Sequence, residues 1–324
     1  MVLGPALAVV ASVAYGLSDV ISGSAVRRHS TASVALWSQV TGLVLLGAGV
    51  LAVRPALTWP ASGWGLAAGA VAAVALLFFY TALQRGRTSV VAPVASTGVV
   101  LPVLVGILGG ERLAWPVAVG VAAVIAGVLV VATAGDGDGP DTSGDPYRGE
   151  RSGRRLLRPS RGRAQPVPAD DRCVPEEGSA PARAAAVLAV LAAAGFGMFF
   201  VLLDLATATG NADFRSSLAI AFAVQVGALV VTALAAVGHT RACLAPTRTL
   251  LLAAGAVALV DVVGDLAIVA AVATGPLAVV GPLGSLDPVV SVLLAMGVLG
   301  ERLRAVQAVG IAAVLVGVVL VATA

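Results

Sequence analysis

The chain has 324 residues, of which 59% are hydrophobic and only 11% are charged, and its formal net charge at pH 7 is +3. Soluble globular proteins carry about 25% charged residues, so the composition excludes a water-soluble enzyme, and the high hydrophobicity excludes a disordered chain. All the basic side chains are arginines, placed in short loops and one linker rather than in a stripe, so nothing indicates nucleic-acid binding.

Ten apolar runs follow one another along the chain, bounded by Arg, Gly, Pro and Trp residues. Most are about 20 residues long, which is the length at which an α-helix spans a bilayer. Strands of an outer-membrane barrel need only about 9–11 residues and alternate apolar with polar side chains, which these runs do not. The sequence therefore predicts an all-α integral membrane protein with ten transmembrane helices, the first of which is retained rather than cleaved as a signal peptide. The runs cover residues 4–26, 33–53, 64–84, 88–109, 114–134, 184–206, 216–237, 250–272, 276–299 and 304–323.

Residues 135–183 differ sharply from the rest of the chain, because they are rich in Gly, Pro, Arg, Asp and Glu. Such a segment buries too little apolar area to offset its ordering entropy. We expect it to be a flexible charged linker between two membrane halves, residues 1–134 and 184–324. Its arginine-rich stretch, 151–163, is either a solvated tether or a contact for anionic lipid headgroups.

The two halves repeat each other. The segment Gly110–Leu113 recurs as Gly300–Leu303, and Val119–Ala134 aligns with Val309–Ala324 without a gap at the same offset. Each half contains five runs, and an odd number makes the second half enter the membrane in the opposite sense. The sequence therefore predicts two inverted five-helix repeats, a construction typical of secondary transporters. The repeated motif contributes Gly110, Glu111 and Arg112 in the first half and Gly300, Glu301 and Arg302 in the second, and we expect these residues to be structural.

Taken together, these features resemble the drug/metabolite transporter superfamily, specifically an EamA-type transporter with two tandem EamA domains. The duplicated Gly-Glu-Arg-Leu turn carries the resemblance, together with the Tyr15-Gly16 pair that recurs as Phe196-Gly197. The resemblance covers everything except the linker, which is longer than the family leads us to expect. It implies a cavity between the repeats, lined mainly by the first, third, fourth, sixth, eighth and ninth helices. It also implies transport of a small metabolite, often outward.

The orientation in the membrane has two competing predictions. Loops after odd-numbered helices carry more arginines than loops after even-numbered ones, so the positive-inside rule places both termini outside and the linker in the cytoplasm. The family resemblance implies the reverse, with both termini inside.

Four aspartates lie well inside apolar runs, at positions 19, 261, 265 and 287. Each costs about 2.5–3.5 kcal/mol at a helix centre, so we expect them to face a cavity, to find partners or to be protonated. Asp261 and Asp265 are four residues apart and share one helix face, where two carboxylates repel and titrate as a pair. That arrangement suits a proton site or an ammonium site. The alternative is that one of them bonds the backbone of a Pro-kinked neighbour.

The other candidate residues have two interpretations each. Asp19 either belongs to the site or lies at the membrane interface, and Asp287, which precedes Pro288, either lines the cavity or caps a broken half-helix. Gln39 and Gln225 occupy matching positions and either join two helices or line the cavity. Aromatic side chains either cover an organic ligand or pack in the interior: Tyr15, Tyr80 and Phe196.

The sequence favours a secondary transporter of the plasma (cytoplasmic) membrane, exporting a small organic molecule by coupling to protons. No arginine lies well inside an apolar run, which argues against strongly anionic cargo and favours an amino acid, an amine or an amphipathic cation. An uncoupled facilitator or channel of the same fold is the alternative. We expect no enzymatic activity, cofactor or metal, because the chain shows no catalytic constellation, no metal-ligand spacing and no nucleotide-binding loop. The expected partners are a small-molecule substrate, the lipid bilayer and, where transport is proton-coupled, protons.

Overall fold

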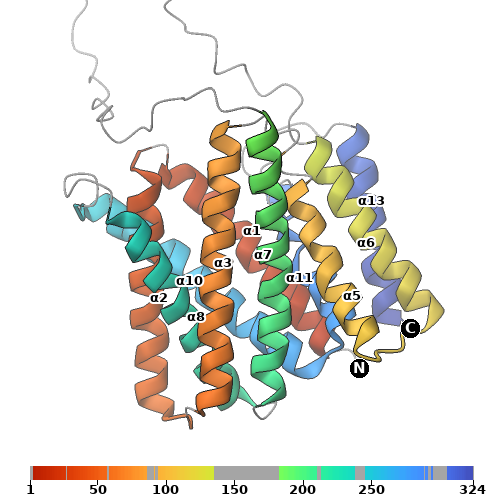
Figure 1. Cartoon of the computed structure of the whole chain (residues 1–324), viewed down its shortest axis with the longest axis horizontal. Helices are drawn as coiled ribbons and strands as arrows, with labels where there is room; N and C mark the ends of the chain where they lie inside the picture. Colours follow the sequence, from red (N-terminus) through yellow and green to blue (C-terminus); the bar gives the residue numbers. More distant parts are fainter. Residues whose placement is uncertain are drawn as a thin grey trace, which may run out of the picture.

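The structure is a computed structural model, and every regular element in the part it describes is helical (Figure 1). The described residues are 3–26, 28–56, 58–85, 91, 94–134, 182–209, 213–237, 245–287, 289–290, 293–294 and 305–323. The elements are α1 (Leu3–Val26), α2 (Thr31–Val53), α3 (Trp59–Arg85), the 3₁₀ turn η1 (Thr97–Val99), α5 (Val100–Leu108), α6 (Trp115–Ala134), α7 (Ala182–Ala208), α8 (Phe214–Ala236), α10 (Arg248–Thr274), α11 (Leu277–Gly284) and α13 (Ala305–Thr323).

Six helices of the described part are long and apolar enough to cross a membrane: α1, α2, α3, α7, α8 and α10. Three shorter apolar helices cover Val94–Leu108, Trp115–Val130 and Ala308–Val321. The expected all-helical membrane fold is thus confirmed. Most of the expected linker, residues 135–181, lies outside the described residues, as do Gly300, Glu301, Arg302 and Pro288.

Helix starts are fixed by polar caps just ahead of the apolar runs. The Thr247 hydroxyl accepts a hydrogen bond from the Leu250 amide at the start of α10. At the start of α8, the Asp213 carboxylate accepts the Ser216 amide at 2.8 Å. Each cap satisfies a backbone donor that has no partner within its helix. The hydrogen bond from the Ser216 backbone also lowers the pKa of Asp213 below its ordinary value.

The helices α6 and α13 cross through glycines that reveal the relation between the halves. A Cβ at Gly127 would lie 2.5 Å from the Gly310 carbonyl oxygen, and a Cβ at Gly120 would lie 2.8 Å from that of Gly317. The earlier glycine of α6, Gly120, therefore meets the later glycine of α13, Gly317, and Gly127 meets Gly310. The two helices thus run antiparallel. Since Gly120 corresponds to Gly310 and Gly127 to Gly317, this is the contact that a two-fold axis between inverted repeats produces.

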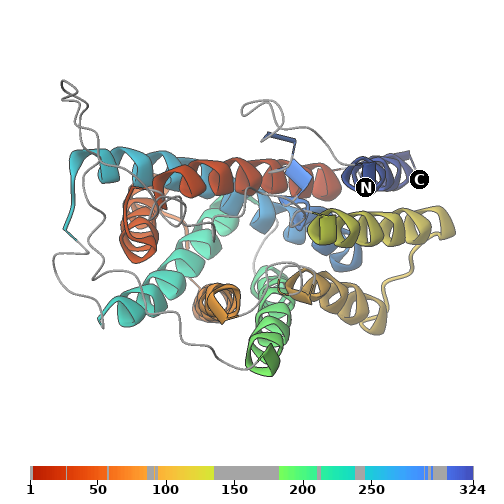
Figure 2. The same cartoon turned by 90° about the horizontal axis from the view of Figure 1, so that it is seen from above.

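The most extensive of the other helix contacts follow the same exchange of halves. Helix α7 of the second repeat packs on α3 of the first, just as α1 of the first packs on α10 of the second. Helix α8 likewise packs on α3 as α2 packs on α10. The pairs α2–α8, α5–α11 and α6–α13 each join equivalent helices. Figure 1 shows that α1 begins and α13 ends at one end of the bundle, while α6 ends and α7 begins at the other. Figure 2 shows α1 and α10 in one row, with α3 and α7 on the opposite side.

The expected run 276–299 is interrupted rather than continuous. Helix α11 ends at Gly284, and the chain becomes helical again at Asp287. Ser12 of α1 bridges this break, because its hydroxyl donates to the Leu283 carbonyl at 2.5 Å and accepts the Leu286 amide at 3.2 Å. A side chain from a neighbouring helix thus satisfies the backbone groups that the interruption frees.

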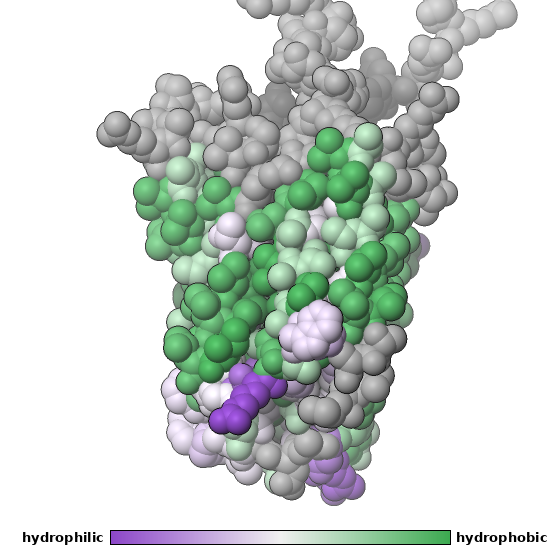
Figure 3. Space-filling model, turned by 90° about the vertical axis from the view of Figure 1, so that its right-hand side faces the viewer, coloured by the Kyte–Doolittle hydropathy of each residue, from purple (hydrophilic) through white to green (hydrophobic). Residues whose placement is uncertain are grey.

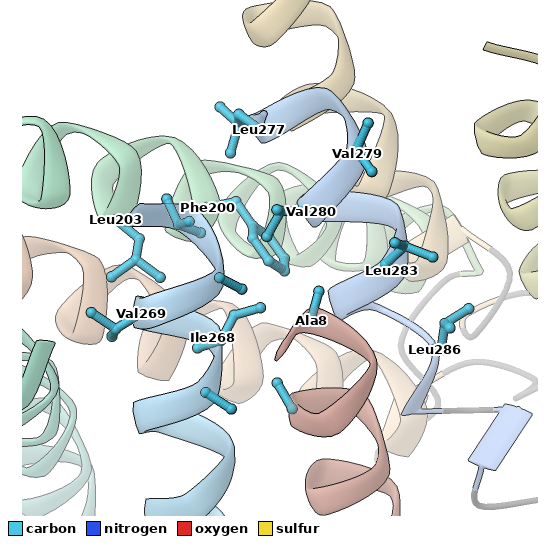
Figure 4. Close-up of a cluster of buried hydrophobic side chains, with 14 of the residues drawn as sticks. Ala8, Phe200, Leu203, Ile268, Val269, Leu277, Val279, Val280, Leu283 and Leu286 are labelled. Carbon is cyan, nitrogen blue, oxygen red and sulfur yellow. The ribbon is translucent and has the colours of Figure 1, made fainter. Parts of the chain in front are cut away.

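Apolar side chains fill the junction of α1, α7, α10 and α11 (Figure 4). There Phe200 and Leu203 of α7 meet Ile268 of α10 and Leu283 of α11, and all four side chains are buried. Large apolar residues also remain on the outer surface, including Leu104, Val119, Val309 and Leu315. Figure 3 shows one side of the molecule on which hydrophobic residues cover most of the described surface. A surface this apolar is suited to lipid.

Candidate functional site

The central polar contact of the bundle joins α1 to α10. The Tyr15 hydroxyl donates a hydrogen bond of 2.8 Å to Oδ1 of Asp265, and both side chains are partly buried. Gly264 makes room for the ring, because a Cβ there would lie 2.7 Å from a ring carbon of Tyr15. Tyr15 lies near the middle of α1 and Asp265 lies well inside α10, so the contact sits at depth in the bundle.

Asp261 lies one turn before Asp265 on the same face of α10, as the spacing of four residues predicts. The Ser18 hydroxyl of α1, which is 6% exposed, interacts with the Asp261 carboxylate. One face of α1 therefore supplies both hydroxyl partners, one for each carboxylate. These partners satisfy part of the hydrogen-bonding capacity of two acids that would otherwise be unfavourable in this environment.

Asp287 follows the break after α11, at the start of the next helical stretch. Tyr15 lies within electrostatic range of Asp287 as well as of Asp261 and Asp265. Gly16 permits this close approach, because a Cβ there would lie 3.0 Å from the Asp287 carbonyl oxygen. The structure thus brings three aspartates of the second repeat around one tyrosine of the first.

Asp19 and Tyr80 complete the group from two other directions. Asp19 is exposed on α1, whose helix continues to Val26, and Tyr80 of α3 is 39% exposed. Tyr80 lies within electrostatic range of both Asp19 and Asp261. We call Asp19, Asp261, Asp265 and Asp287 the acidic cluster. The arginines of the described helices lie in first or last turns, far along the chain from the acidic cluster.

The contact between α3 and α7 that is equivalent to the Tyr15–Asp265 contact is made by two aromatic side chains. Tyr15 corresponds to Phe196 in the duplicated aromatic-glycine pair, and Asp265 corresponds to Phe79 at the offset that relates α10 to α3. The rings of Phe79 and Phe196 meet edge to face with centroids 6.2 Å apart. Phe79 also lies 5.9 Å from the ring of Tyr80. The same helix crossing therefore carries a carboxylate–hydroxyl pair in one place and a pair of phenyl rings in the other.

Gln39 and Gln225 meet directly between α2 and α8. The Gln225 Nε2 donates to the Gln39 backbone oxygen at 2.8 Å and to its side-chain Oε1 at 2.6 Å. Gln225 is buried and Gln39 is partly buried. Of the two interpretations of these glutamines, this geometry matches the one in which they join two helices.

The first copy of the repeated motif forms a turn that reaches across to the other repeat. Gly110 adopts φ +96° in this turn, a conformation that favours glycine, and it therefore lies outside α5. The Glu111 carboxylate accepts the Leu277 amide at 2.7 Å and the Ala278 amide at 2.9 Å, at the start of α11. Arg112 is exposed. The sequence indicated a structural motif here but did not identify the partner of Glu111.

Two small cavities lie elsewhere. One of ≈160 Å³ adjoins Thr209 and Ser216, and one of ≈200 Å³ lies between α3 and α7 beside Phe78 and Gly195. None of the four aspartates lines either cavity. No group of three or more metal-ligating side chains occurs among the described residues.

The fold and its contacts define a multi-pass membrane protein built from two inverted helical repeats. Both repeats match the model of the EamA-like transporter family, over residues 2–133 and 183–323. The chain belongs to the EamA-like transporter family, and it is a transporter rather than an enzyme.

Comparison with solved structures supports the same fold. A crystal structure of a protein with 16% sequence identity superposes with a TM-score of 0.69, covering 98% of this chain and 95% of that one. A search of curated proteins found no match to the chain.

Proposed function

We propose that the protein is a secondary transporter of the plasma membrane that exports a small organic amine or amphipathic cation in exchange for protons. The observation that carries the proposal is the Tyr15–Asp265 hydrogen bond beside a second carboxylate, Asp261, on the same helix face. Ionisable groups within membrane helices are costly, and they commonly mark solute or proton pathways. Amino acids remain within the proposal through their ammonium group.

The charge of the site supports a cationic solute. Asp261 and Asp265 lie one turn apart on α10 and repel each other, and Asp287 lies within electrostatic range of the same Tyr15, while the arginines of the described helices lie in terminal turns. A positively charged solute lowers the mutual repulsion of the carboxylates, whereas an anion raises it. Carboxylate oxygens also accept several hydrogen bonds each, which matches the donors of an ammonium group.

The aromatic counterpart of the site supports a solute with an apolar part. Phe196, Phe79 and Tyr80 form a chain of ring contacts, and Tyr80 is within electrostatic range of Asp19 and Asp261. Aromatic faces attract cations as well as apolar surface. The proposed solute therefore places its ammonium group among the carboxylates and its apolar part along these rings.

Proton coupling follows in this proposal from competition for the same carboxylates. A carboxylate that binds a proton no longer attracts the ammonium group, so the two cations bind alternately. Tyr15 keeps one oxygen of Asp265 engaged and leaves the other oxygen for a proton or a solute. Alternation between two access states then moves the solute one way and the proton the other.

Transport in proteoliposomes with an imposed pH gradient tests the proposal. We expect 2-phenylethylamine to accumulate against its gradient when the pH gradient is present. Asp265→Asn should abolish the response to the gradient while leaving expression intact, and Asp261→Asn should weaken it. Asp213→Asn is the matched control, since Asp213 is an exposed N-cap and Asn also caps helices well.

Two outcomes contradict the proposal. Accumulation of the amine that ignores the pH gradient favours an uncoupled facilitator of the same fold. Gradient-driven transport that is unchanged in Asp265→Asn removes this residue, and the hydrogen bond from Tyr15, from the coupling mechanism.

A further inference from the structure

The contact between Gln39 and Gln225 lies on the axis that relates the two repeats. The two residues are equivalent, since residues 67–72 of repeat 1 match residues 253–258 of repeat 2 at the same offset of 186 positions. They join α2 to α8, which are themselves equivalent helices. Exchanging the two halves swaps Gln39 with Gln225, so the exchange maps this contact onto itself.

The contact is nevertheless asymmetric. Both protons of the Gln225 Nε2 are directed at Gln39, one at its backbone oxygen and one at its Oε1. The mirror arrangement would have the Gln39 Nε2 donating to the backbone oxygen and the Oε1 of Gln225. Exchange of the two halves converts the first arrangement into the second.

The same exchange relates the two access states of a transporter made of inverted repeats, because each half then takes the conformation of the other. An asymmetric contact on the axis must invert in that step. We propose that Gln39 and Gln225 form a two-position switch, in which Gln225 is the donor in this state and Gln39 is the donor in the oppositely facing state. This inference rests on alternation between two states and not on the solute or the coupling ion proposed above.

The residues beside the switch favour the present arrangement. Gly42 faces the donor amide, and a Cβ there would lie 2.7 Å from the Gln225 Nε2. The position equivalent to Gly42 is Ala228, which is buried. In the mirror arrangement the Gln39 amide meets the methyl group of Ala228, whereas in this state the Gln225 amide meets no side chain at Gly42.

At the end of the bundle where α1 begins, α1 packs closely against the chain just before α11 in this state. A Cβ at Gly4 of α1 would lie 2.6 Å from the Gly275 Cα, just before α11. Glu111 binds the first amides of α11, and Ala278 there is fully buried. A cysteine at position 278 therefore reports the opening of this end through its rate of reaction with a maleimide.

Leucine substitutions separate the two positions of the switch. Gln225→Leu removes both hydrogen bonds of the present state but only one of the mirror state, since the Gln39 amide still reaches the backbone oxygen at position 225. Gln39→Leu does the opposite. Because each single variant favours one state by one hydrogen bond, each should shift the equilibrium about five-fold, in opposite directions.

The experiment measures maleimide labelling of Ala278→Cys in nanodiscs, where both faces are accessible, after Cys173 and Cys243 have been replaced by serine. We expect Gln225→Leu to raise the labelling rate about five-fold and Gln39→Leu not to raise it. The double variant should return toward the parent rate, because it removes two bonds from each state. A contact that merely holds α2 and α8 together predicts that both single variants raise labelling equally.

Two variants that keep both amides provide a second test. Gly42→Ala crowds the donor amide of this state, and Ala228→Gly relieves the mirror state, so both should raise labelling at position 278. The switch is overturned if the two glutamine variants change labelling equally or if neither changes it. It is also overturned if neither Gly42→Ala nor Ala228→Gly changes labelling. Since no solute or gradient is used, these results are independent of the transport test.

Discussion

The hydrogen bonds of Glu111 give the sharpest prediction about the architecture. Its carboxylate binds the Leu277 and Ala278 amides, which belong to the opposite repeat, and these donors have no partner within α11. Glu111→Gln keeps one acceptor oxygen but places an NH₂ group against the other amide. Hydrogen bonds to charged groups contribute about 1.5–3 kcal/mol each, and the lost helix-terminus charge adds about 0.3–1 kcal/mol. The variant should therefore lose about 2–4 kcal/mol of stability.

Arg112→Gln is the matched control, because it neutralises the adjacent, exposed charge. Thermal unfolding of the purified protein should show a Tm lower by about 5–10 °C for Glu111→Gln than for the control. Hydrogen exchange should also accelerate at the amides of residues 277 and 278. If the two variants unfold within about 1 °C of each other and exchange at these amides is unchanged, Glu111 does not secure α11.

Three further predictions concern a cap, a helix crossing and the topology. Asp213→Ala should lower the protection of the first-turn amides of α8 against hydrogen exchange. Because the pKa of Asp213 is lowered in the folded state, its cap is present at neutral pH and is lost as the pH falls through that lowered pKa. Protection, measured as the exchange rate relative to that of the unfolded amide at the same pH, should therefore fall with acid in the parent but not in the variant. Gly127→Ala should lower the stability by about 1–3 kcal/mol because of the close Gly310 oxygen, whereas Gly63→Ala, which meets no atom within 4 Å, should be neutral or stabilising by up to about 1 kcal/mol. Alkaline phosphatase, which is active only outside the cytoplasm, should be active when fused at Ala324 and inactive when inserted at Ser160, as the distribution of arginines predicts.

Helix positions followed from the apolar runs, because only a helix satisfies its own backbone in lipid. The run 216–237 became α8, Phe214–Ala236, and the run 250–272 became α10, Arg248–Thr274. The helices begin slightly earlier than the runs, since Asp213 and Thr247 cap them from polar sequence. The interruption after Gly284 was harder to predict, because Ser12, which stabilises it, is 271 residues away from Leu283.

The acidic cluster was predictable because a charged residue in an apolar run is costly and therefore conspicuous. The partners of these acids were not equally visible. Tyr15 was a candidate among several aromatics, and Ser18 carried no signal in a run that contains other serines. Phe79 was missed, because a phenylalanine in an apolar run is unremarkable until the halves are aligned. The separation of 166 positions between Glu111 and Leu277 likewise hid that contact.

Chemical modification of the carboxyl groups within the helices tests whether the acidic cluster is the solute site. Dicyclohexylcarbodiimide enters the bilayer and modifies protonated carboxyl groups, and mass spectrometry locates the adduct. We expect an adduct at Asp261 or Asp265 whose formation is slowed by 2-phenylethylamine in the parent. If these residues are modified at the same rate with and without a solute that the protein transports, the solute binds elsewhere and the acidic cluster is not its site.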